Sequence, residues 1–101
     1  MGYRREFPDY DDMLYIPHGW KDLSWHNDTM PRAGIVLLDI PQVQVIASLW
    51  QDYRDINLRE CQVGGRFFFE IQVNGESIFE YGSDNLDNIK PLIRATVGGD
   101  V

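Results

Sequence analysis

Residues 58–82, LRECQVGGRFFFEIQVNGESIFEYG, decide the fold class of this 101-residue chain. Three runs rich in apolar, aromatic and β-branched residues are separated by Gly64-Gly65 and Asn74-Gly75. These dipeptides accept the positive φ angles of tight hairpin turns. The pattern predicts a three-stranded antiparallel meander whose first strand lies over LRECQV.

The register of the second hairpin can also be argued. A two-residue Asn74-Gly75 loop would place Phe69 opposite Glu80 and mix charged and aromatic side chains on both faces. A one-residue slip moves every side chain to the other face, so the register that separates them is favoured. A three-residue loop, Val73 to Gly75, separates the charged from the aromatic side chains. It pairs Phe69 with Phe79 and Phe67 with Tyr81, and Ile71 lies on the same face. The acidic residues Glu70, Glu76 and Glu80 then lie on the other face.

Residues 82–99, GSDNLDNIKPLIRATVGG, predict a short C-terminal helix, because Leu86, Ile89 and Ile93 have helical spacing. With Asp87 as N-cap, Pro91 is the fourth helical residue, where the missing amide has no intrahelical partner. Gly98-Gly99 ends the helix. We expect it to lie across the face that carries Phe67, Phe69 and Ile71.

Residues 34–54, GIVLLDIPQVQVIASLWQDYR, fit two patterns. Alternation from Val43 to Leu49 indicates a strand, whereas Val43, Ile46, Ala47, Trp50 and Tyr53 would form the apolar stripe of a helix over 41–54. Dense β-branching favours the strand. The chain is therefore predicted to be one α+β domain over residues 1–101, an antiparallel β-meander of about four to five strands with a short C-terminal helix packed on one face. Residues 1–33 are a largely irregular covering segment.

Charge and cysteine content indicate which partners and which cellular compartment suit this protein. The formal net charge is −7 and the pI is about 4.5, so direct binding to nucleic-acid phosphates is disfavoured and a basic protein surface is favoured. A single cysteine, Cys61, excludes an internal disulfide and fits a reducing compartment. No apolar run is long enough for a signal peptide core or a membrane helix, so we expect a cytoplasmic location and no membrane contact.

Residues 18–28, HGWKDLSWHND, contain both histidines and two of the three tryptophans. On a helix, His18, Asp22 and His26 would point the same way, and two imidazoles with a carboxylate can hold a metal ion. Pro17, Gly19 and Asn27-Asp28 oppose such a helix. We therefore favour an irregular segment anchored by Trp20 and Trp25, with no metal or other cofactor. A tryptophan left exposed would be a strong binding anchor.

No catalytic set is evident in the sequence. Cys61 could be a nucleophile if His18 or His26 lay beside it, but a predicted strand offers no helix N-terminus to lower the pKa of the thiol. A buried structural thiol is expected instead. The serines lie in no nucleophile elbow, and the glycines form no phosphate-binding loop.

Acidic and aromatic residues alternate in FPDYDDMLY (7–15) and WQDYRD (50–55). Carboxylates can bind guanidinium groups while the rings supply rigid contact area. With the two tryptophans, these segments give the predicted partner-binding residues: Asp9, Tyr10, Asp11, Asp12, Trp20, Trp25, Asp52, Tyr53 and Asp55.

The leading hypothesis is a small acidic, non-enzymatic protein–protein interaction module. It would be an inhibitor, an immunity-type protein or a phage-encoded antagonist that binds a basic site on a partner, such as a nucleic-acid-binding groove. Two alternatives stay open. One is a metal-binding protein or metal-dependent enzyme using His18, Asp22 and His26, and the other is a structural, self-assembling subunit that pairs through an exposed sheet edge.

Overall fold

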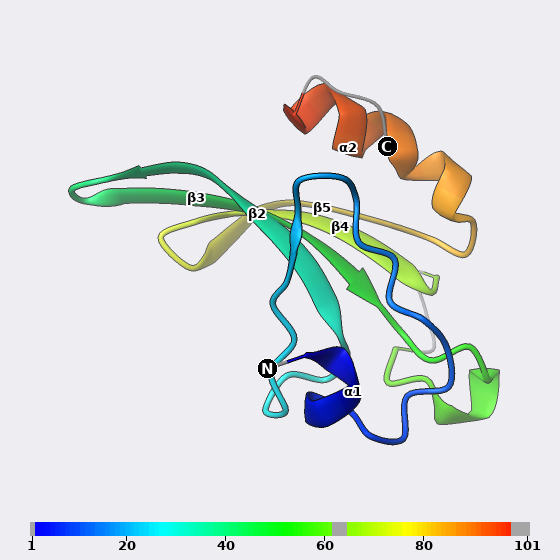
Figure 1. The fold of residues 1–101 in the computed structure, drawn as a ribbon. Helices are drawn as coiled ribbons and strands as arrows, with labels where there is room; N and C mark the ends of the chain where they lie inside the picture. The colour runs from blue at the N-terminus through cyan, green and yellow to red at the C-terminus, as the bar shows by residue number, and fades with distance from the viewer. Residues whose placement is uncertain (1, 62–64, 98–101) are drawn as a thin grey trace.

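A computed structural model describes residues 2–61 and 65–97. Its sheet has five antiparallel strands in the order β1-β2-β3-β4-β5, and a short helix lies on one face (Figure 1). The predicted α+β meander is confirmed. No helix in the described ranges is long and apolar enough to cross a membrane. The elements are α1 (Tyr3–Glu6), β1 (Lys21–Asp22), β2 (Arg32–Ile40), β3 (Val43–Gln51), η1 (Ile56–Leu58), β4 (Phe67–Val73), β5 (Glu76–Ser83), η2 (Leu86–Asn88) and α2 (Lys90–Val97).

Strands β2 and β3 form a long hairpin, so the strand interpretation of this region is confirmed and the alternative helix over 41–54 is wrong. Ile40 pairs with Val43 across the two-residue turn Pro41-Gln42. Proline suits the first central position of a type II turn, and Gln42 takes the positive φ (73°) that the second position requires. Proline therefore marks a hairpin here rather than the start of a helix.

The expected first strand of the meander, over residues 58–63, is wrong for its described part. Leu58 ends η1, Arg59 to Cys61 form a loop, and β3 takes the place beside β4. Residues 62–64 lie outside the described residues, and with them Gly64 of the expected hairpin. Gly65 has φ +104°, and a Cβ there would meet the Ser83 backbone carbonyl carbon at 2.5 Å. This glycine is thus required by close approach to the end of β5.

The predicted three-residue loop between β4 and β5 is also wrong. Val73 pairs with Glu76, and Asn74 (φ 52°) and Gly75 (φ 81°) form a two-residue turn with the positive φ values of type I′. Glu76 therefore shares the face of Val73, contrary to the expected sorting. The expected pairs Phe69–Phe79 and Phe67–Tyr81 do not occur.

A β-bulge achieves most of the sorting that the longer loop was expected to give, with Glu76 as the exception. The register shifts between Ile71 and Gln72, so that Phe69 pairs with Tyr81 and Ile71 with Phe79. A bulge adds one residue to one strand, which moves the following side chains to the other face. As a result, Phe69, Ile71, Phe79 and Tyr81 share one face, and Glu70 pairs with Glu80 on the opposite face.

Helix α2 packs on the apolar face, as predicted. Ile89 and Ile93 are fully buried in one core with Trp20, Ala33, Ala47, Leu49, Phe67 and Phe69. The predicted start of the helix is wrong: the Asn85 side chain caps η2 by accepting from the Asp87 amide, and Pro91 is the second residue of α2. Gly98-Gly99 lies outside the described residues.

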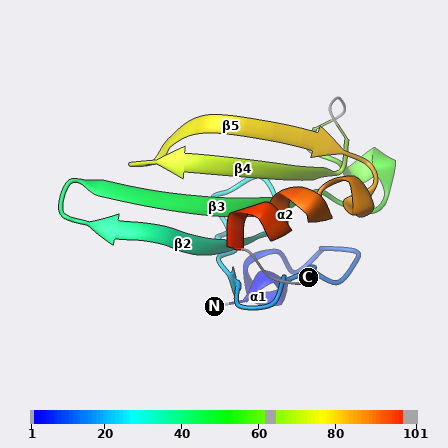
Figure 2. The same cartoon turned by 90° about the horizontal axis from the view of Figure 1, so that it is seen from above.

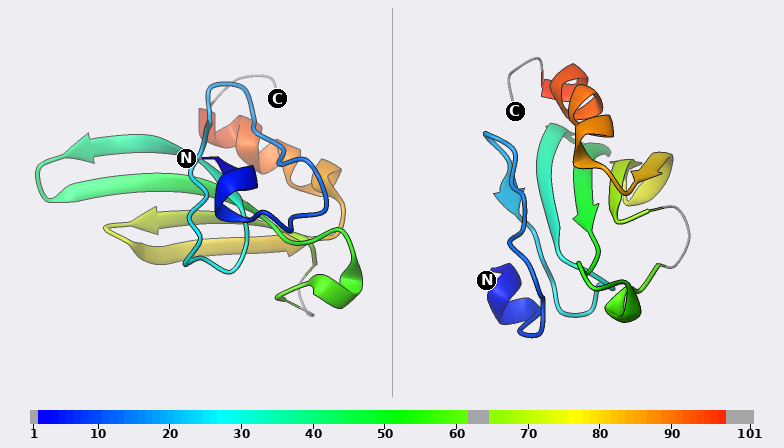
Figure 3. Two further views of the ribbon diagram at one scale, coloured as in Figure 1. Left: turned by 60° about the horizontal axis from the view of Figure 1, so that its bottom comes forward. Right: turned by 90° about the vertical axis from the view of Figure 1, so that its right-hand side faces the viewer.

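The N-terminal segment runs along the β2 side of the sheet, with α1 on the side away from α2 (Figure 3). It contains the short elements α1 and β1 and is otherwise irregular until β2 begins. Its apolar residues Phe7, Leu14, Trp20 and Met30 are buried. These buried side chains attach the segment to the rest of the fold.

Candidate interaction surface

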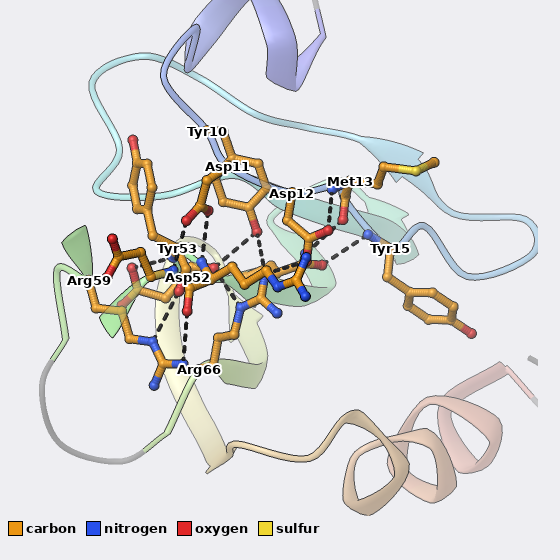
Figure 4. A network of polar contacts seen from close by, with 12 residues as sticks. Tyr10, Asp11, Asp12, Met13, Tyr15, Asp52, Tyr53, Arg59 and Arg66 are labelled. Carbon is orange, nitrogen blue, oxygen red and sulfur yellow. Dashed lines mark hydrogen bonds and ion pairs between the residues drawn. The ribbon is translucent and has the colours of Figure 1, made fainter. Parts of the chain in front are cut away.

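The two acidic–aromatic segments meet in space, although more than forty residues separate Asp11 from Arg54 and Asp55 (Figure 4). The Asp11 carboxylate accepts hydrogen bonds from the backbone amides of Arg54 (2.8 Å) and Asp55 (2.7 Å). The Tyr10 hydroxyl donates to the Asp52 carbonyl at 3.0 Å, and its ring packs edge-on against Tyr53 at 5.2 Å. The structure thus joins segments that the sequence only groups by composition.

Asp52 is fully buried, and its carboxylate organises the loop after β3. It accepts from the backbone amides of Tyr53 (2.8 Å), Glu60 (3.0 Å) and Cys61 (2.9 Å). A buried carboxylate is tolerated when such donors satisfy it. These bonds explain why residues 59–61 form a loop instead of the expected strand.

Arg66 ties the N-terminal segment to the sheet. Its Nη2 donates to the Asp12 carboxylate at 2.7 Å and to the Tyr10 hydroxyl at 3.4 Å, while Nε donates to the Asp52 carbonyl at 3.0 Å. The hydrogen bond from Arg66 lowers the pKa of Asp12. Burial raises the pKa of Tyr10 to about 12, so this hydroxyl stays protonated at neutral pH.

Most of the nine predicted partner-binding residues are therefore used inside the molecule. Tyr10, Trp20 and Asp52 are buried, and Tyr53 is half-buried. Asp11 and Asp12 hold the segments together, and the Asp55 carboxylate accepts from the Asn57 amide at the start of η1. Asp9 and Trp25 are left facing solvent without such a bond in the described network.

Residues 18–28 do not form the helix on which the alternative metal site depends. The Asp22 carboxylate accepts from the backbone amides of Tyr3 (2.7 Å) and Ser24 (3.0 Å). His26 Nδ1 lies 3.0 Å from the Glu6 carboxylate, and the hydrogen bond from His26 lowers the pKa of Glu6. Within residues 2–61 and 65–97, no three His, Cys, Asp or Glu side chains are grouped to hold a metal ion.

Cys61 is half-buried in the loop after η1. Burial raises the pKa of its thiol, and the nearby Asp52 and Glu60 carboxylates act in the same direction. A raised pKa disfavours the thiolate, which is the nucleophilic form. The environment of Cys61 suits a structural thiol, but the side chain is half-buried and not buried as the sequence predicts.

The sheet face opposite α2 carries a second polar arrangement. Trp50 Nε1 donates to the Glu70 carboxylate at 2.8 Å, and the Arg32 guanidinium lies 4.8 Å from the centre of the Trp50 ring. Trp25, 50% exposed, lines a hollow of about 520 Å³ on this face. The expectation that Trp25 is buried with Trp20 to anchor the segment is wrong, and Trp25 is instead positioned as a surface anchor.

Exposed large hydrophobic residues are most numerous where the two long hairpins end, at residues 36–46 and 71–81, here called the double-hairpin end. Both hairpins project well beyond α2 (Figure 2). A nine-residue strand spans about 30 Å, whereas an eight-residue helix spans about 12 Å, so α2 covers only part of the sheet. Seven of the twelve exposed large hydrophobic residues in the described chain lie there: Val36, Leu37, Leu38, Ile40, Ile78, Phe79 and Tyr81.

All charged residues at the double-hairpin end are acidic. Its charged residues are Asp39, Glu76 and Glu80, and it contains no lysine or arginine. An exposed apolar surface of this kind usually marks an interaction site. The site prediction missed these residues, although the apolar run IVLLDI (35–40) and the lack of basic residues were visible signals.

Comparisons with protein family models, with curated proteins and with solved structures give no match to this chain.

Proposed function

We propose that this protein is a non-enzymatic protein–protein interaction module that holds a basic partner against its double-hairpin end. One observation carries the proposal: Leu38, Ile40 and Phe79 are exposed on the α2 face of the double-hairpin end, and the charged residues of that end are all acidic. The apolar side chains supply contact area, and the carboxylates favour a partner rich in lysine and arginine. This moves the proposed contact away from the Asp11–Asp55 cluster, which is engaged internally.

The acidic character also suggests what such a module would do. A partner with a basic site is often one that binds nucleic acid, and an acidic protein seated on that site would block it by competing for the same charges. An inhibitor or immunity-type role in the cytoplasm is therefore part of the proposal. Trp25 is available as an additional anchor, because it is half-exposed at the rim of a hollow.

A pair of matched variants tests the proposal. In the test variant Leu38, Ile40 and Phe79 are changed to serine. In the control, Met13, Ile56 and Leu58, which are also exposed large hydrophobic residues, are changed to serine. Proteins retained from a lysate of the native host by the unmodified chain are identified, purified and titrated against all three proteins. We expect a basic partner whose affinity falls at least about tenfold with the test variant and little with the control.

Ionic strength gives the second readout. If charge steers the association, the rate constant for binding should fall steeply as salt rises. Equal retention by the test and control variants, or association indifferent to salt, would contradict the proposed function.

A further inference from the structure

The outer edge of β2 is open over most of its length. Strand β1 pairs with β2 only at Lys21–Gly34 and Asp22–Ala33. Before Lys21 the chain leaves the edge, because Trp20 is buried in the core and its amide bonds the Pro17 carbonyl at 2.9 Å. In the part of the chain that the structure describes, no strand pairs with the outer side of Ile35–Ile40. This open stretch is about 20 Å long.

The two outer edges of the sheet are protected to different degrees. Proteins usually protect exposed edges with charges, prolines or bulges, because unpaired backbone groups invite another strand. Strand β5 has Glu76, Glu80 and a bulge, whereas Ile35–Ile40 of β2 has a bulge and Asp39 as its single charged residue. The β2 edge is thus the more receptive one.

Pairing with β3 shows what an added strand would meet. On the α2 face of the sheet, an added strand would lie beside Ile35, Leu38 and Ile40. These residues pair on their other side with β3, at Ala47, Val45 and Val43 respectively. On the opposite face it would lie beside Val36 and Asp39. A segment that alternates apolar residues with lysine or arginine fits both faces.

A hollow marks the start of this open stretch. It measures about 230 Å³ and is lined by Gly19, Lys21, Leu23, Gly34, Ile35 and Val36. It lies where β1 leaves β2, in line with the position that an added strand would take. An apolar side chain near the end of that strand could enter it.

Charge and shape favour a foreign strand over a second copy. Pairing two copies would bring together two surfaces that both lack lysine and arginine. The bulge between Val36 and Leu38 also disturbs the regular pairing of two identical rigid edges, while a flexible segment can follow it. We propose that β2 receives an extended basic segment of the partner as an added strand along Ile35–Ile40. This inference rests on the proposed function and specifies how its partner docks.

Peptide titrations followed by NMR and hydrogen exchange test this docking mode. The probe is a heptapeptide of alternating lysine and valine. Its two comparison peptides have glutamate in place of lysine, or the same sequence with every backbone amide N-methylated. We expect the lysine peptide to protect amides within residues 35–40, and N-methylation to weaken binding by more than about tenfold because the added strand loses its donors.

Matched substitutions locate the contact. Asp39→Lys should weaken binding of the lysine peptide about fivefold, whereas Glu76→Lys, equally part of the double-hairpin end but on β5, should change it less than about twofold. Equal binding of the N-methylated peptide, protection on β5 instead, or no binding at millimolar peptide overturns strand addition. So does a dimer in light scattering that protects residues 35–40, since a second copy would then occupy the edge. The proposed function survives these results if the captured partner still requires Leu38, Ile40 and Phe79.

Discussion

The two ends of the sheet differ in cover, although the same four long strands run through both. At the α2 end, Leu49 and Phe69 are buried beneath Ile89 and Ile93. At the double-hairpin end, Ile40 on the neighbouring strand is 52% exposed. The covered end therefore stabilises the fold, whereas the uncovered end is exposed and available to a partner.

The two ends also differ in how they use acidic side chains. Near the covered end, Asp12 and Asp52 are satisfied by Arg66 and by backbone amides. At the double-hairpin end, Asp39 and Glu76 are exposed. Acidity therefore stabilises the N-terminal attachment at one end and can steer a partner at the other.

The largest expected effect comes from a cavity in the covered end. Leu49→Ala removes a fully buried side chain from the core and should lower the free energy of unfolding by about 3 kcal/mol. Ile40→Ala at the exposed end should lower it by less than about 0.5 kcal/mol. Urea unfolding of both variants measures the difference, and equal losses would show that the double-hairpin end is also part of the stabilising core.

An intermediate effect is expected from the buried carboxylate. Asp52→Ala leaves three backbone amides without their acceptor and should cost about 2 kcal/mol. Asp55→Ala, which removes one exposed cap of η1, should cost about 0.5 kcal/mol. Thermal and urea unfolding compare the two, and the Asp52 network would lose its assigned importance if the costs were the same.

The smallest effect should come from the Asp12–Arg66 ion pair, which is partly exposed. The pKa of Asp12 is lowered in the folded state, so its stabilisation is present above the ordinary value of 3.8 and is lost as the pH falls through the folded value. Asp12→Asn should therefore be less stable than the unmodified chain by at most about 1 kcal/mol at pH 7. The difference should shrink below pH 3.8, and exposed Asp9→Asn is the control. A difference independent of pH would mean that the ion pair does not contribute as assigned.

Sequence reasoning succeeded where the signal is local. Alternation and β-branching identified the strand from Val43, the turn chemistry of Asn74-Gly75 identified the last hairpin, and helical spacing of Ile89 and Ile93 identified α2. Sequence reasoning failed at residues 58–61. The backbone amides of Glu60 and Cys61 donate to the Asp52 carboxylate, and no local pattern reveals these hydrogen bonds. The β4–β5 register was missed for a related reason, since a bulge puts Phe79 and Tyr81 on the same face as a longer loop would.

The candidate site shows the same difference between local sequence signals and contacts of distant segments. Composition grouped Tyr10 and Asp11 with Asp52 and Asp55 as partner-binding residues, but it could not show that their polar atoms face one another. Trp20 and Trp25 are alike in sequence context, yet one is buried beside Ala33 and the other is half-exposed. Whether each tryptophan is buried depends on where the N-terminal segment crosses the sheet.

The sequence alone determined the kinds of elements, the apolar face of the sheet and the acidic balance, because periodicity, turn residues and charge are properties of neighbouring positions. Only the tertiary structure decided that Asp52 turns inward and that Ile40 stays in solvent. Both outcomes depend on contacts between distant segments and on the reach of a helix that is shorter than the strands it covers.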